Sequence, residues 1–93
     1  MLVQHKQLGG KGMFYIGLDG HIVAEMTYTL PAANKMIIDH TEVDASLSGK
    51  GAGKQLLYTA VAYARSHEMK IIPLCPFAKA LFDKIPEIRD VLQ

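Results

Sequence analysis

A glycine-rich run joins a strand-like segment to a long amphipathic helix near the middle of the chain. Residues 43–54 read Val-Asp-Ala-Ser-Leu-Ser-Gly-Lys-Gly-Ala-Gly-Lys. Alternate glycines let the backbone turn sharply and bring its N–H groups close to a ligand, and a helix N-terminus attracts anions. The run therefore predicts a phosphate-binding turn, with a flexible loop before a glycine helix start as the alternative interpretation.

Length and composition limit the classes of protein that fit. The 93 residues predict one domain, residues 1–93, with one core. Their net charge of +1, without a basic tract, disfavours a nucleic-acid partner. No window is apolar enough to cross a membrane and no secretory leader is recognisable, so we expect a cytoplasmic protein without a membrane partner. Cys75 is the lone cysteine and has no zinc-site spacing to a histidine, so we expect no metal.

Strand-forming residues dominate the first half of the chain. Residues 13–18 and 21–29 are predicted antiparallel strands, and Asp19-Gly20 between them is a strong hairpin-turn signal. The breaker at residues 30–35 separates them from a third strand at 36–43, whose far end turns polar. Polar residues at the end of a strand that leads into a phosphate turn indicate a site.

Helical periodicity dominates the second half. Apolar residues recur at a helical period over 51–68, which predicts a long helix. The short apolar run 70–74 then returns as a parallel neighbour of the third strand. Pro76 opens a second helix that ends before Pro86, and residues 87–92 are consistent with a last turn.

Two common phosphate-binding motifs do not fit the glycine run. A P-loop needs glycine at Ser48 and serine or threonine at Gln55. The dinucleotide fingerprint needs a larger parallel sheet than this length allows.

Two motifs in order resemble those of the GNAT N-acetyltransferases. Val43-Asp44-x-x-Leu47-x-Gly49-Lys50-Gly51-Ala52-Gly53 looks like their motif A, whose loop is usually written Arg/Gln-x-x-Gly-x-Gly/Ala, and residues 75–84 look like motif B. With residues 40–43 and 73–77, the chain is similar to the very small single-domain members that carry a cysteine here. The resemblance implies an α/β fold of the GNAT type: a twisted, mostly antiparallel sheet with a splayed parallel strand pair, a central helix and a C-terminal helix.

The resemblance also implies how acetyl-CoA would be bound. The pantetheine arm would lie between the splayed strands and pair with strand backbone, and the diphosphate would meet the amides of the glycine turn. The residues expected to contact acetyl-CoA are Thr41, Glu42, Val43, Ser48, Gly49, Lys50, Gly51, Ala52, Gly53, Lys54, Cys75, Pro76 and Phe77.

The chain departs from the family pattern in three places. Ser48 stands at the Arg/Gln position, so that side-chain contribution to the phosphates is missing. Phe82 stands where many members have a tyrosine acid, and phenylalanine has no proton to give. The two helices that wall the acceptor site in larger members are missing, so we expect an open acceptor side.

Cys75, His40 and Glu42 are the candidate catalytic residues. Cys75 follows a strand where a helix begins, and a helix N-terminus favours the thiolate, although a lone cysteine is commonly a small buried hydrophobe. His40 would take a proton from this thiol or from an incoming amine, and Glu42, on the same strand face, is the alternative base. The alternative interpretation of His40 is a strand histidine that faces water and has no catalytic role. His5, His21 and His67 fall where we expect only surface histidines.

The expected function is transfer of an acetyl group from acetyl-CoA to a primary amine of a small molecule or a protein lysine. Direct attack by the amine and an acetyl-Cys75 intermediate both stay open. The alternatives are a non-catalytic CoA-binding sensor or interaction module, and an interaction domain without a cofactor. We expect a monomer or a weak homodimer.

Overall fold

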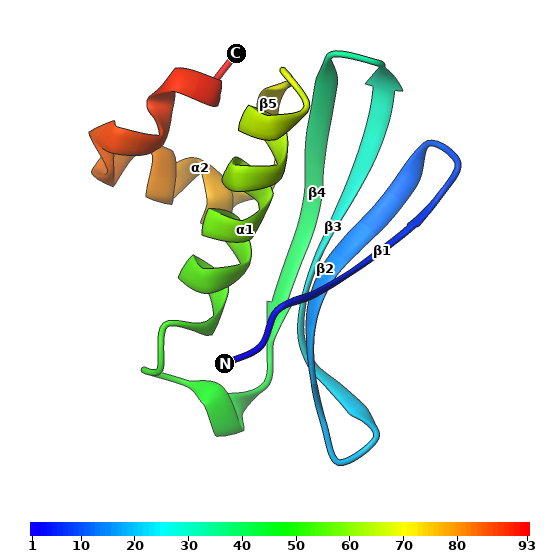
Figure 1. Ribbon diagram of the computed structural model, residues 1–93. Coiled ribbons are helices and arrows are strands. Elements are labelled where there is room, and N and C mark those ends of the chain that lie inside the picture. The colour runs from blue at the N-terminus through cyan, green and yellow to red at the C-terminus, as the bar shows by residue number, and fades with distance from the viewer.

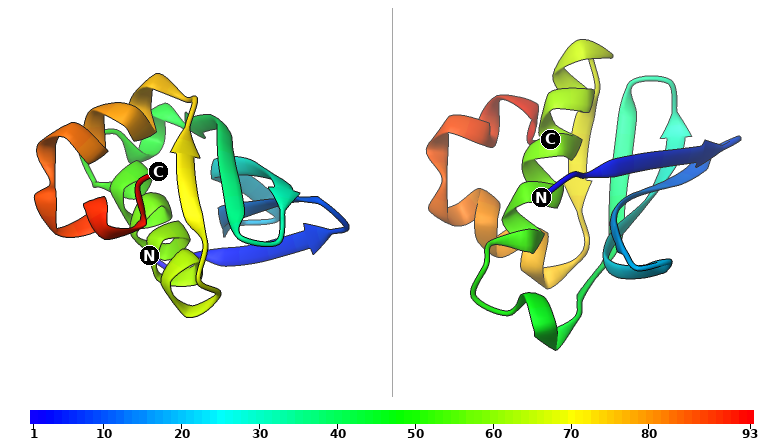
Figure 2. Two further views of the ribbon diagram at one scale, coloured as in Figure 1. Left: turned by 90° about the horizontal axis from the view of Figure 1, so that it is seen from above. Right: turned by 60° about the horizontal axis from the view of Figure 1, so that its bottom comes forward.

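The computed structural model describes all 93 residues and shows a five-stranded sheet with its helices on one face (Figures 1 and 2). The strands lie in chain order, antiparallel from β1 to β4, with β5 parallel to β4. The mixed architecture with one parallel pair confirms the predicted fold. The strands are β1 (Gln4–Leu8), β2 (Lys11–Leu18), β3 (His21–Ala32), β4 (Lys35–Val43) and β5 (Lys70–Pro73).

Two α-helices, α1 (Ala52–Ser66) and α2 (Pro76–Lys84), cover the sheet. Each turn of α1 buries small or aliphatic residues against the sheet. This helix returns the chain so that β5 lies beside β4, as predicted. Proline at the first position of α2 suits a helix start because its missing N–H has no helical partner. Short 3-10 helices, η1 (Ala45–Leu47) and η2 (Pro86–Val91), complete the chain. Neither α-helix is long and apolar enough to span a membrane.

The turn between β2 and β3 has the conformation that its sequence predicts. Asp19 and Gly20 both adopt positive φ angles, 51° and 79°, as a type I′ hairpin requires. The predicted breaker at 30–35 is wrong in its extent, because β3 continues to Ala32 and only the two residues before β4 form the turn. A further difference is β1, whose residues are all exposed and therefore carry no alternating apolar signal.

The two faces of the sheet differ in composition. The face toward the helices carries the core, and its strand residues are Phe14, Ile16, Ala24, Met26, Tyr28, Met36, Ile38 and Ile71. The other face has no helix over it (Figure 2) and carries polar and charged side chains. Ile22 does not join Ala24 in the core and is 46% exposed, because the register shifts between Ile16 and Gly17.

His5 lies at the surface, as expected, but it also anchors β1 to the core. Its Nε2 lies 2.6 Å from the Tyr28 hydroxyl, and its ring stacks on Phe14 with centroids 4.4 Å apart. Burial, and then the charge of His67, lower the pKa of His5, while burial raises the pKa of Tyr28 to about 12. The pair is therefore held in its neutral forms near pH 7.

Gly12 gives the test of this packing. A Cβ atom at Gly12 would overlap the Tyr28 hydroxyl and stand 2.6 Å from the Lys6 carbonyl oxygen, whereas one at Gly17 would come no closer than 3.7 Å to any neighbour. We expect Gly12→Ala to lower the free energy of unfolding by about 1–3 kcal/mol through overpacking. Urea unfolding measures the change, with Gly17→Ala as the control. Equal stabilities of the two variants would contradict this account of β1 packing.

Candidate functional site

Strands β4 and β5 separate halfway along β4. Their pairing runs from Lys35–Lys70 to Ile38–Pro73. There the backbone N–H groups of Leu74 and Cys75 both donate to the Ile38 carbonyl, at 3.1 and 3.2 Å, and the ladder ends. Beyond this point β4 continues to Val43 and pairs with β3 alone. The edge of residues 40–43 that faces β5 therefore lacks a strand partner, and its peptide groups are open to an extended ligand.

A β-bulge at Asp39 coincides with this separation. Ile38 lies opposite Tyr28 and His40 opposite Thr27, so Asp39 is an extra residue on β4. One extra residue reverses which side chains point to which face. Met36 and Ile38 point into the core before the bulge, and Thr41 does so after it.

Thr41, and not His40, is the partner of Cys75. The Cys75 thiol donates to Thr41 Oγ1 over 3.3 Å, and Cys75 is the N-cap residue of α2. Burial alone raises the pKa of this thiol, but hydrogen bonds with the Thr41 hydroxyl and with backbone N–H groups at the start of α2 outweigh it and lower the pKa. Cys75 is only 5% exposed. The result is a nearly buried thiol that releases its proton more readily than an ordinary cysteine does.

His40 and Glu42 point away from this thiol. Their side chains are 60% and 72% exposed, and His40 Nε2 lies 3.8 Å from Glu42 Oε2. The predicted common face for the two residues is confirmed. The predicted transfer of the Cys75 proton to His40 is wrong in geometry. Without the bulge, His40 would point to the same face as Ile38, toward the helices; with it, His40 points to the open face and Thr41 to the helix face. A proton acceptor for a ligand on the open face is the role that this position allows.

The glycine turn ends in the N-terminus of α1. Gly49 and Gly51 have φ angles of 78° and 74°, which favour glycine, and a Cβ atom at either would meet nothing within 4 Å. Gly51 is the N-cap and makes no side-chain cap bond. Because the first helical bond runs from the Gln55 N–H to the Gly51 carbonyl, the N–H groups of residues 52–54 lie at the open end of the helix. These donors, with the positive end of the helix dipole, suit an anion.

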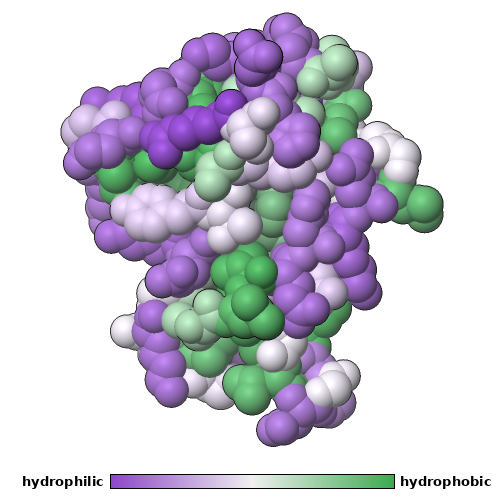
Figure 3. Space-filling view, viewed as in Figure 1, coloured by the Kyte–Doolittle hydropathy of each residue, from purple (hydrophilic) through white to green (hydrophobic).

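A hollow of about 270 Å³ adjoins this turn. Residues of the glycine turn and apolar residues of β4, η1 and α2 line it together. In the view of Figure 1, hydrophobic surface gathers near the middle and lower part of the molecule, close to the N-terminus and the start of α1 (Figure 3). The lining residues are Val43, Leu47, Ser48, Gly49, Gly51, Ala52, Gly53, Lys54, Phe77 and Leu81.

Close packing between the two helices explains the third glycine. A Cβ atom at Gly53 would overlap the Phe77 ring and come within 2.8 Å of its Cε2 atom. The lack of a side chain at Gly53 therefore lets Phe77 of α2 pack closely against α1. The turn motif did not reveal this structural role. Phe82, at the family's acid position, is 1% exposed and belongs to the core. Lys54 Nζ lies 5.6 Å from the Tyr58 ring centroid, so this lysine is directed along α1.

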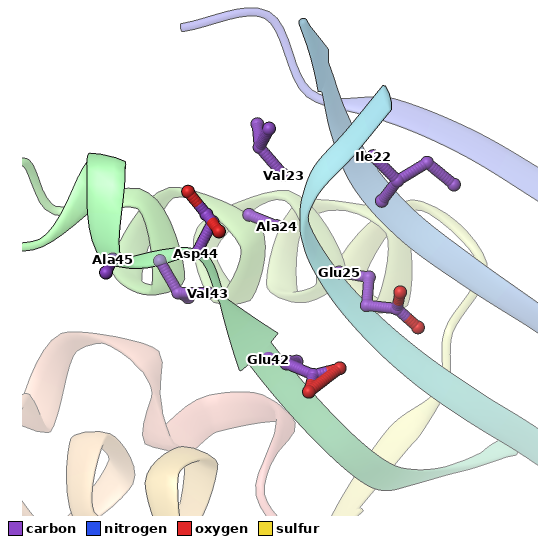
Figure 4. A pocket seen from close by; sticks show the side chains of 8 residues that line it. All are labelled: Ile22, Val23, Ala24, Glu25, Glu42, Val43, Asp44 and Ala45. Carbon is purple, nitrogen blue, oxygen red and sulfur yellow. The ribbon is translucent and has the colours of Figure 1, made fainter. Parts of the chain in front are cut away.

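A second hollow, of about 380 Å³, lies where β3 begins and β4 ends, near η1. Ile22, Glu25 and Glu42 point to the same side of their strands in Figure 4. Glu25 lies directly opposite Glu42 in the sheet register. The sequence motifs did not single out Glu25, because only the pairing of β3 with β4 brings it to Glu42.

Comparisons with known proteins agree on the relationship. Residues 13–91 match the family described as GCN5-related N-acetyl-transferase. A GCN5-like protein from Staphylococcus aureus is 41% identical over 97% of this chain and 87% of its own, with a TM-score of 0.76. No curated protein matches the sequence.

More distant solved structures share the fold. The ribosomal-protein-alanine N-acetyltransferase of Brucella melitensis, 21% identical, aligns over 83% of this chain with a TM-score of 0.70, and the chain spans 62% of its length. A GNAT acetyltransferase of Elizabethkingia anophelis with acetyl-CoA bound, 13% identical, aligns over 81% of this chain and 52% of its own, with a TM-score of 0.62.

Thr41→Val tests the environment of the thiol. Removing the hydroxyl removes a hydrogen bond to the thiolate, so we expect the pKa of Cys75 to rise. The rate of Cys75 alkylation by iodoacetamide, followed against pH, should then reach half of its maximum at a higher pH than in the unchanged protein. Thr27→Val is the control, because Thr27 lies opposite His40 on the open face. Identical pH profiles for both variants would contradict the assignment of Thr41.

Proposed function

Because this chain belongs to the GCN5-related N-acetyltransferase family, we propose that residues 1–93 form one domain that transfers an acetyl group from acetyl-CoA to a primary amine. The observation that carries the proposal is the separation of β4 from β5 next to the open N-terminus of α1. An unpaired strand edge suits the amide groups of a pantetheine arm, and a helix N-terminus suits a diphosphate. An acetyl-CoA-bound relative with the same fold supports this choice of cosubstrate.

Acetyl-CoA would occupy the helix face of the separated strands. Its pantetheine would pair with the backbone of Thr41, Glu42 and Val43, and its diphosphate would accept hydrogen bonds from backbone N–H groups of the turn. Pro76 and Phe77 at the start of α2 would line the other side of the arm, near Cys75. The residues proposed to receive the diphosphate are Ser48, Gly49, Lys50, Gly51, Ala52, Gly53 and Lys54.

The amine would approach from the open face. Glu42 or His40, both exposed there, would accept its proton, and the freed nitrogen would attack the acetyl carbonyl carbon. A carbon–nitrogen bond forms, the nitrogen releases its second proton to solvent, the carbon–sulfur bond breaks, and CoA leaves as a thiolate. The Cys75 thiol lies on the opposite side, where it would protonate that thiolate and regain a proton from solvent. Burial of Cys75 and its distance from the open face favour this direct route over an acetyl-Cys75 thioester.

Gly51→Val tests the cosubstrate site. A valine at a φ of 74° is strained and places a side chain between the turn amides and a diphosphate. We expect the dissociation constant of acetyl-CoA, measured by calorimetry, to rise about tenfold or more, since hydrogen bonds to charged groups are lost. Gly20→Val carries the same backbone strain at a distant hairpin, where φ is 79°, and should leave the affinity unchanged. Equal affinity in both variants would refute the site.

Turnover assays with three variants test the chemistry. The rate of CoA release is measured over a panel of amines for His40→Ala and for Glu42→Gln. The variant that removes the general base should lower this rate by about 10²–10⁴-fold. Cys75→Ala should retain some transfer and should form no labelled protein with radioactive acetyl-CoA. Accumulation of acetylated Cys75 in the unchanged protein would favour the thioester route instead. Tight acetyl-CoA binding without CoA release on any amine would replace the enzyme by a binding module.

A further inference from the structure

The open face of the sheet carries a pair of carboxylates and a pair of cations on different strands. Register places its side chains in rows across the strands, and two of these rows are Gln4–Tyr15–Glu25–Glu42 and Lys6–Met13–Thr27–His40. The carboxylates of Glu25 and Glu42 stand on the inner strands β3 and β4. The cations of Lys6 and Lys11 stand on the outer hairpin of β1 and β2.

The inner region is acidic and hollowed. Glu25 and Glu42 are direct cross-strand neighbours, a placement in which like charges repel each other. The 380 Å³ hollow that they border also has Ile22 on its rim, so it offers carboxylates beside apolar surface. A lysine side chain has this combination, because an apolar stem carries its ammonium group.

The outer region is basic and more spacious. A hollow of about 620 Å³ is lined there by Lys6 and Lys11, with Met13 and the largely exposed Leu8 beside them. Asp39 also borders this hollow, and its carboxylate accepts a hydrogen bond from the Thr29 hydroxyl at 2.7 Å. The lining therefore holds two cations and one anion. Lys6 Nζ lies 5.1 Å from the Tyr15 ring centroid, which holds this cation over the face.

We infer that the acceptor is a lysine within an extended acidic peptide that lies across this open face. The inference rests on the proposed acetyl transfer. The ammonium group of the lysine lies at Glu25 and Glu42, and acidic side chains of the same peptide lie at Lys6 and Lys11. A small polyamine fits less well, because its second ammonium group would lie near Lys6 and Lys11 and be repelled by their like charge.

The spacing follows from the sheet. Lys6 is two strands away from Glu25 and two residues along, which corresponds to about 12 Å at the usual strand spacing and rise. An extended peptide covers about 3.3–3.6 Å per residue. This reach falls between the third and the fourth position from the acetylated lysine. Because successive side chains of an extended peptide point to opposite sides, acidic residues at both positions ensure that one of them faces the sheet.

Matched peptides test this inference. Each peptide has blocked ends and one lysine in an alanine and glycine background. Two peptides carry a pair of glutamates, one at positions +3 and +4 from the lysine and the other at −3 and −4. Each has a counterpart with glutamines in place of the glutamates. We expect kcat/KM for one glutamate peptide to exceed that of its glutamine counterpart by about two- to fivefold at low salt, the size of one exposed ion pair. The ratio should approach one at high salt.

Charge reversal supplies the second arm. In Lys6→Glu/Lys11→Glu the preference should disappear, and a peptide with lysines at the distal positions should become the better acceptor. Lys79→Glu/Lys84→Glu, which makes the same change of net charge on exposed positions of α2, is the control and should keep the preference. Circular dichroism and thermal unfolding verify that all variants are folded.

The outcomes separate this inference from the proposed function. Acetylation of all peptides at equal rates, or faster acetylation of spermidine than of any peptide, overturns the acidic-peptide acceptor and leaves acetyl transfer intact. Absence of CoA release with every peptide and amine overturns both. Loss of the preference in the Lys79/Lys84 control as well overturns the assignment of Lys6 and Lys11.

Discussion

The end of the β4–β5 ladder at Ile38 is the constraint on which the candidate site depends. One carbonyl oxygen receives the N–H groups of both Leu74 and Cys75, so β5 stops pairing there while β4 continues. This arrangement leaves a free strand edge that leads directly into the glycine turn and the N-terminus of α1. It also fixes Cys75 at the start of α2, beside the strand edge. Sheet pairing, helix dipole and thiol thus meet at one place.

The bulge at Asp39 gives the two faces of β4 different chemistry. Thr41 and Cys75 meet on the helix face, where they are shielded, and His40 and Glu42 stand on the face without helices. A cosubstrate and an acceptor can therefore approach the same strand from opposite sides. In the proposed reaction the uncovered sheet supplies the acceptor surface, with the charges of β1 to β4.

Local signals in the sequence were sufficient for most of the fold. The Asp19-Gly20 turn, the periodicity of α1 and Pro76 at the start of α2 each have a local physical cause, and the structure confirms them. Features that depend on strand register were not predictable. Alternation alone would place His40 beside Cys75, and only the bulge shows that Thr41 occupies that place. Likewise, β1 has no apolar alternation, because its anchor is the contact between His5 and Tyr28.

The central claim is that the strand edge and the glycine turn together bind coenzyme A. A ¹H–¹⁵N NMR titration of the full chain with acetyl-CoA tests it most directly. The account predicts the largest shifts for the amides of residues 41–43 and 48–54 and for Cys75, with little change in the hairpin of β1 and β2. Saturating acetyl-CoA that leaves the amides of the turn unshifted, or that shifts the hairpin alone, would contradict it.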